Sequence, residues 1–88
     1  MKTEDLLLSR YGTPLIPLDL WVRDYFPHLK VEKYIAKTLR GEISIPLVRM
    51  EGSQKSARAI HVADGGAYLD KRIEAARKEC RQLSGGAS

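Results

Sequence analysis

The stretch that decides the fold is Leu47-Val-Arg-Met-Glu-Gly-Ser-Gln-Lys-Ser-Ala-Arg-Ala-Ile-His-Val62. At both ends of this stretch apolar and polar residues alternate, as is typical of short strands, and a polar turn containing glycine separates them. We predict strands over Ile43–Glu51 and Ala57–Val62, joined by the loop of residues 52–56. The stretch is therefore expected to form a β-hairpin with a basic connecting turn.

Two helical patterns precede this hairpin. Apolar residues recur at i, i+3, i+4 and i+7 over Leu18–Tyr25, which predicts a helix with one buried face. A second helix is expected from about Lys30 to Arg40, with a buried stripe of Val31, Tyr34, Ile35 and Leu39. Gly41 follows it as the residue expected to stop the helix in a left-handed conformation. The order of helix, turn, helix and hairpin is the plan of a winged helix-turn-helix.

Further elements flank this unit. Thr3 can cap a short N-terminal helix, and residues 15–17 are expected to be extended because a residue before proline avoids the helical region. A last helix is predicted over about Ala63–Leu83, with inward-facing side chains at Tyr68, Leu69, Ile73, Ala76 and Cys80. The predicted fold class is α+β: a small winged helix-turn-helix domain with a β-hairpin wing and a C-terminal helix. We expect one domain over residues 1–83 and a disordered tail over residues 84–88.

Positive charge concentrates in the segment that this plan would place against DNA. The 88 residues carry 15 Lys and Arg against 11 Asp and Glu, a net charge of +4. From Pro27 to Arg58 there are seven basic and three acidic residues, so this segment alone has a net charge of +4. A basic surface favours a polyanionic partner. We therefore expect double-stranded DNA as the main partner.

Composition argues against several other classes of protein. Cys80 is the only cysteine, so no disulfide can form within the chain, and a reducing cytoplasm fits. No apolar run approaches the roughly 18–20 residues of a membrane span. His28 and His61 lack metal-ligand spacing, and no inward-facing pair of carboxylates suggests acid–base catalysis. We expect a soluble cytoplasmic protein that is not an enzyme and has no membrane contact, no metal and no cofactor.

The candidate DNA-binding residues fall into two groups. The recognition-helix group would enter the major groove, with Lys30 near a phosphate at the helix start; it comprises Lys30, Lys33, Lys37 and Arg40. The wing group would contact the adjacent backbone, because phosphate contacts supply about half to two-thirds of protein–DNA hydrogen bonds. It comprises Arg49, Ser53, Gln54, Lys55, Ser56 and Arg58. Each group also has a simpler interpretation as solvated surface, and Arg49 could pair with Glu51 or Glu42 instead.

The chain resembles the PrtN family of pyocin transcriptional activators over about Tyr11 to Arg77. The most specific match is Pro46-Leu-Val-Arg-Met-Glu51 followed by Ser53-Gln-Lys-Ser-Ala57. Further matches are Ile16-Pro-Leu-Asp19, Arg23-Asp-Tyr-Phe26, Glu32-Lys33, Gly41-Glu-Ile43, His61-Val-Ala-Asp64 and Tyr68-Leu-Asp70. More distantly, the order of elements looks like that of excisionase and MerR-type winged helices. The chain departs from the family pattern at Gly65-Gly66, where that pattern has apolar or alanine residues.

The resemblance implies activation of bacteriocin or phage-tail-like genes through DNA binding, in a bacterial or phage-infected cell and at its nucleoid. The expected function is a sequence-specific transcriptional activator of prophage or pyocin-like genes. RNA polymerase and a second copy of the chain are further candidate partners. Two alternatives stay open: an excisionase-like protein that bends DNA, and a phage adaptor whose basic face binds an acidic protein.

Overall fold

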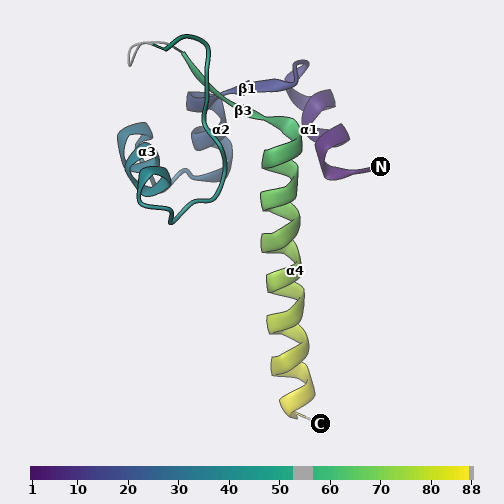
Figure 1. Cartoon of the computed structure of the whole chain (residues 1–88). Helices are drawn as coiled ribbons and strands as arrows, with labels where there is room; N and C mark the ends of the chain where they lie inside the picture. Colours follow the sequence, from purple (N-terminus) through teal and green to yellow (C-terminus); the bar gives the residue numbers. More distant parts are fainter. Residues whose placement is uncertain (53–56, 88) are drawn as a thin grey trace.

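The computed structural model describes residues 1–52 and 57–87 of the chain. Its elements in chain order are α1 (Thr3–Tyr11), β1 (Leu15–Pro17), α2 (Leu18–Tyr25), α3 (Val31–Leu39), β2 (Val48–Arg49), β3 (Arg58–His61) and α4 (Val62–Ala87). The first three helices and the sheet form a head, from which α4 extends as a long rod (Figure 1). The molecule accordingly measures 55 × 30 × 18 Å. The expected α+β class is confirmed.

The sheet has three antiparallel strands in the order β1-β3-β2. Ile16 pairs with Ile60 between β1 and β3, and Val48 pairs with Ala59 between β2 and β3. The extended segment before α2 therefore adds a third strand to the predicted hairpin. Its pairing with β3 spans more than forty residues of chain, and periodicity within either segment carries no information about it.

The first hairpin strand is much shorter than the predicted range Ile43–Glu51. Only Val48–Arg49 form a ladder, and the chain before them runs irregularly along the head. Ile43 and Ile45 alternate as a strand would, but they are buried in the hydrophobic core. Pro46 has no N–H to donate to a neighbouring strand. The alternation in this segment therefore reflects core packing without sheet pairing.

The second hairpin strand and the two central helices lie close to their predicted bounds. β3 covers Arg58–His61, and Val62 already begins α4. The predicted turn between α2 and α3 is present, with the Leu29 N–H donating to the Phe26 carbonyl at 3.0 Å. α3 spans Val31–Leu39, one residue shorter at each end than predicted.

Gly41 ends α3 as predicted. Its φ is +78°, and its N–H donates to the Thr38 carbonyl at 3.0 Å. The next N–H, from Glu42, donates to the Lys37 carbonyl at 2.9 Å. These two bonds form a Schellman motif, which requires a left-handed residue at this position. The chain therefore turns sharply out of α3 toward the hairpin.

The core of the head lies between α2, α3 and the sheet. Its largest fully buried side chains are Trp21, Tyr34, Ile16, Ile45 and Ile60. The Trp21 indole donates to the Tyr34 hydroxyl at 3.1 Å, which links α2 to α3. The Phe26 ring meets the Tyr34 ring edge-on, with 5.0 Å between centroids, a favoured aromatic geometry.

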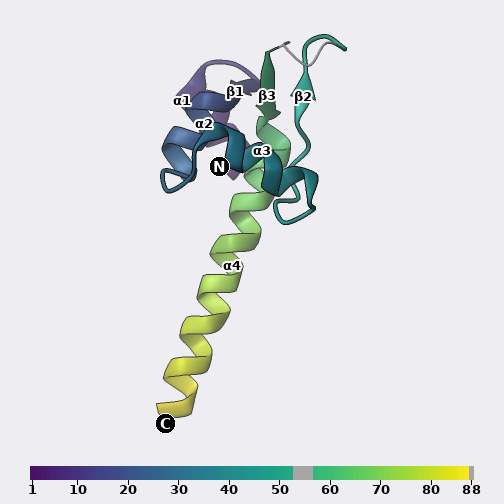
Figure 2. The same cartoon turned by 90° about the vertical axis from the view of Figure 1, so that its left-hand side faces the viewer.

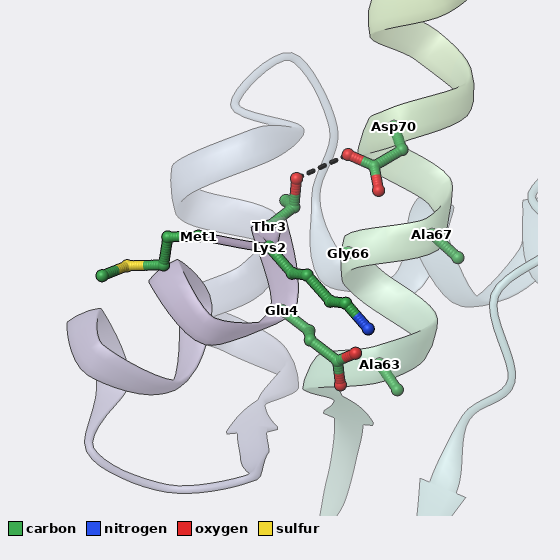
Figure 3. Close-up of a pocket in the computed structure, with 8 residues that line it drawn as sticks. All are labelled: Met1, Lys2, Thr3, Glu4, Ala63, Gly66, Ala67 and Asp70. Carbon is green, nitrogen blue, oxygen red and sulfur yellow. Dashed lines mark hydrogen bonds between the residues drawn. The ribbon is translucent and has the colours of Figure 1, made fainter.

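Gly65 and Gly66 have a packing role at the start of α4. A Cβ at Gly65 would lie 3.1 Å from the Trp21 ring, and one at Gly66 would lie 3.0 Å from the backbone nitrogen of Glu4. Glycine therefore allows α4 to approach α2 on one side and α1 on the other. Figure 3 shows Gly66 of α4 facing the first turn of α1.

The start of α1 differs from the expectation in one contact. Lys2 is the N-cap residue, and its backbone N–H donates to the Asp5 carboxylate at 3.2 Å. The Thr3 hydroxyl, expected to cap the helix, donates to the Asp70 carboxylate of α4 instead (Figure 3). Thr3 thus ties α1 to α4 across the open hollow between them.

The predicted burial and end of the last helix are partly wrong. Tyr68 and Leu69 pack against the core, but Ile73 is 43% exposed, and Ala76 and Cys80 are exposed because α4 has already left the head. The helix also continues through residues 84–87, where a disordered tail is predicted. Serine and glycine lower helix propensity there, but extending a formed helix costs far less than nucleating one.

Candidate nucleic-acid interface

The candidate interface is built on α3, which α2 holds in place. α2 buries Leu18, Trp21 and Val22, and α3 buries Tyr34 against them. This packing leaves the opposite side of α3 in solvent. In Figure 2, α3 crosses in front of α4, and β2 and β3 lie on the side of the C-terminal end of α3. The outward side of α3 and the hairpin therefore share one side of the molecule, away from the α4 rod.

The outward face of α3 is more mixed than the sequence predicts. Helical spacing places Glu32, Lys33, Ala36, Leu39 and Arg40 on this face. Lys33 and Arg40 are exposed as expected, and Lys30 is exposed at the N-cap. Leu39, predicted to be buried, is 73% exposed because the core contact of α3 centres on Tyr34.

Ala36 and Leu39 are therefore candidate contact residues that the predicted DNA-binding set omits. Apolar side chains on a groove-facing helix can contact the thymine methyl group, and a glutamate can accept from the cytosine amine. The sequence feature that points to Leu39 is its position in the last turn of α3, which the core does not cover. Such a face combines charge with groups able to distinguish bases.

Lys37 and Arg40 are both paired with a carboxylate, which the prediction does not include. Arg40 Nε donates to the Glu42 carboxylate, and Lys37 Nζ lies 3.6 Å from the other Glu42 oxygen. The Arg40 hydrogen bond is the main reason that the pKa of Glu42 is lowered, so Glu42 stays ionised near neutral pH. The Schellman turn at Gly41 places Glu42 there. Exposed pairs of this kind are worth about 0–1 kcal/mol and can exchange for a phosphate.

The hairpin places two wing residues side by side. Arg49 of β2 is the cross-strand partner of Arg58 of β3, so both side chains lie on one face of the sheet. Arg49 is exposed and Arg58 is half-buried. The other wing candidates, Ser53, Gln54, Lys55 and Ser56, lie outside the described residues. Arginine residues paired across two strands are a residue type and placement that suit an anion such as phosphate.

The two histidines have structural positions in this fold. His61 Nδ1 accepts the N–H of Ala63 at 3.1 Å, so its ring is bonded to the backbone at the start of α4. His28 is exposed in the α2–α3 turn, with its ring centroid 6.1 Å from that of Phe26. In the described part of the chain, no three His, Cys, Asp or Glu side chains gather as a metal site would require.

An ionic cluster that sequence reasoning missed fastens α1 to α2. Asp24 accepts from the Tyr11 hydroxyl and from Arg23 Nε at 3.0 Å, and the Arg10 guanidinium lies 3.4 Å away. The Arg23 and Tyr11 hydrogen bonds lower the pKa of Asp24 to about 2. Burial, followed by the bond to Asp24, raises the pKa of the Tyr11 hydroxyl well above its usual range. The cluster supports the head and is not placed on the α3 face.

Comparison with known protein families finds a match over most of the chain. The profile of the family described as pyocin activator protein PrtN matches residues 3–76, most of the chain. The chain belongs to the pyocin activator family. The predicted resemblance is thus confirmed, and the match covers the head and the first part of α4. Pyocin activators are a family of regulatory proteins and not of enzymes. No curated protein and no solved structure matches the chain.

No helix among the described residues has the length and apolar character needed to cross a membrane.

Proposed function

We propose that this pyocin activator family member binds double-stranded DNA as a winged helix-turn-helix and activates transcription of pyocin-like genes. α3 enters the major groove with Lys33 and Arg40, and Lys30 neutralises a phosphate at its start. The observation that carries the proposal is the outward α3 face, which lies on the same side of the molecule as the hairpin with Arg49 (Figure 2).

Two features of the head and the family match support this proposal. The Trp21–Tyr34 contact fixes α3 on α2, so the outward face is presented on a rigid element. The Schellman turn at Gly41 sets the direction of the chain from α3 into the hairpin. The family match supplies the regulatory role. Activation further implies a contact with RNA polymerase, for which the exposed charged surface of α4 is a candidate.

The test is duplex binding as a function of salt. If about five basic side chains contact phosphates, the logarithm of affinity should fall against log salt with a slope of about −4 to −5. Lys33→Ala should weaken binding, and Lys78→Ala, which removes the same charge from exposed α4, is the matched control. A flat salt response, or no binding at low salt, would refute DNA binding and leave a protein-binding adaptor.

A second measurement separates activation from DNA bending. Reporter transcription from a bound promoter should rise with the protein, and a bending assay on the same site should show little added curvature. Strong bending without transcription would instead support the excisionase-like alternative.

A further inference from the structure

The exposed part of α4 carries an apolar stripe along one face. Its members follow one another at intervals of four and three residues: Leu69, Ile73, Ala76, Cys80 and Leu83. This spacing keeps them on the seam of a helix that packs against another helix. Leu69 packs against the core of the head, whereas Ile73 is 43% and Leu83 74% exposed. The face that α4 buries in the head thus continues into solvent.

The charged residues beside the stripe suit an antiparallel copy of the same helix. When Ile73 lies opposite Ala76 of the partner subunit, Leu69 lies opposite Cys80 of the partner subunit. The flanking positions then bring Arg72 beside Glu79 of the partner subunit and Asp70 beside Arg77 of the partner subunit. Two-fold symmetry repeats both pairs, so the antiparallel alignment gives four attractive pairs.

The parallel alignment of the same seam is unfavourable. It pairs identical residues along the stripe, and its flanking positions bring Arg72 beside Arg77 of the partner subunit. Two-fold symmetry gives two copies of this repulsive pair. The order of charged residues along α4 therefore gives attractive pairs in an antiparallel dimer and a repulsive pair in a parallel dimer.

A hollow at the head end of the stripe provides space for the end of a second helix. It has a volume of about 380 Å³ and lies between the α2–α3 turn and α4, lined by Tyr25, Phe26, His28, Tyr68, Leu69 and Arg72. In the antiparallel alignment, Glu79 of the partner subunit lies beside Arg72, which lines this hollow. The hollow thus borders the proposed contact.

We propose that α4 forms an antiparallel homodimer through the stripe Leu69–Leu83. The stripe is about 21 Å long at 1.5 Å per residue. A contact this short is expected to be weak and to strengthen with chain concentration. Its two-fold axis would place the two heads at opposite ends of the helix pair. If the proposed DNA binding holds, such a dimer would contact two inverted half-sites.

The first test compares two neighbouring alanines in the full chain without DNA. Ala76 lies on the stripe and Ala75 does not, and both are exposed, so Ala76→Glu and Ala75→Glu change charge and helix propensity equally. Sedimentation velocity over a range of chain concentrations should show a monomer–dimer equilibrium for the parent. Ala76→Glu should raise the dissociation constant at least about tenfold, and Ala75→Glu should leave it close to that of the parent.

The second test establishes the direction of the helices. Arg72→Glu should weaken an antiparallel dimer by facing Glu79 of the partner subunit, and adding Glu79→Arg should restore it. In a parallel dimer Arg72→Glu would face Arg77 of the partner subunit and tighten association. A parent that is monomeric at every concentration, equal effects of the two alanine variants, or tightening by Arg72→Glu would each overturn the proposal. None of these results depends on DNA, so they are distinct from failure of the proposed function.

Discussion

The indole Nε1 of Trp21 donates a hydrogen bond of 3.1 Å to the hydroxyl of Tyr34, and both side chains are fully buried. The bond joins the centre of α2 to the centre of α3. Burial raises the pKa of Tyr34 to about 12, so its hydroxyl stays neutral throughout the physiological range. The position of the outward α3 face therefore depends on a polar contact inside the core.

Removing this acceptor should destabilise the head. Tyr34→Phe leaves the buried Trp21 N–H without a partner, and an unsatisfied buried donor costs about 1–3 kcal/mol. Tyr25→Phe is the control, because Tyr25 is half-buried and no hydrogen bond of its hydroxyl is found among the described residues. Urea unfolding of both variants measures the difference. Equal midpoints would show that the buried bond contributes nothing to stability.

Gly66→Ala should destabilise the protein, although alanine in a helix is ordinarily favoured by about 1 kcal/mol over glycine. The new Cβ would lie 3.0 Å from the backbone nitrogen of Glu4, and backbone cannot yield as a flexible side chain can. Gly85→Ala, in the same helix with nothing within 4 Å of its Cβ, should leave stability unchanged or raise it. Thermal melts followed by circular dichroism give both values. Stabilisation by Gly66→Ala would mean that α1 does not pack against α4 as described.

Asp24 should make stability fall in acid. Its pKa is lowered from 3.8 to about 2 in the folded chain, chiefly by the Arg23 and Tyr11 hydrogen bonds. A lowered folded pKa gives stability that is complete above about pH 4 and is lost as the pH falls toward 2. Asp24→Asn should lower the melting temperature at pH 7 and flatten its decline between pH 4 and 2. Asp19→Asn, at an exposed carboxylate of the same helix, should preserve the decline.

Gly41→Val should cost at least about 1–2 kcal/mol, because a β-branched residue must adopt the left-handed conformation there. Gly52→Ala should cost less, since Gly52 has no positive φ and its Cβ would meet nothing within 4 Å. Thermal melts of the two variants decide this. A Gly41→Val protein that melts like the parent would mean that α3 does not end at this residue. DNA binding should fall with stability, because α3 and the hairpin would lose their relative direction.

Glu42→Gln should tighten DNA binding under the proposed function. The ionised Glu42 carboxylate pairs with Arg40 and Lys37, so its neutralisation frees two cations for phosphate. Affinity at low salt should rise severalfold, and the salt slope should become steeper. Glu74→Gln, which removes a carboxylate paired with Arg77 and Arg81 on α4, should have little effect. Weaker binding by Glu42→Gln would instead indicate that Glu42 orients Arg40 for the contact.

Local sequence predicted the elements whose signals are local. The apolar spacing of α2, the stop at Gly41 and the turn between α2 and α3 each depend on neighbouring residues, and each lies where predicted. The burial of Leu39 was predicted wrongly, because helical spacing gives a face but not how far along the helix the core extends. The ion pairs of Glu42 were missed because they depend on the path of the chain after Gly41.

By itself, the sequence determined the α+β class, the family and the concentration of basic residues between Pro27 and Arg58. Only the tertiary structure decided that β1 pairs with β3, that Gly65 and Gly66 are needed for close packing, and that α4 leaves the head after Leu69. The physical reason is the separation along the chain of the residues that make each kind of contact. Backbone conformation and periodicity are fixed by contacts within a few residues, whereas strand pairing, close approach and exposure depend on segments that meet only in the folded chain.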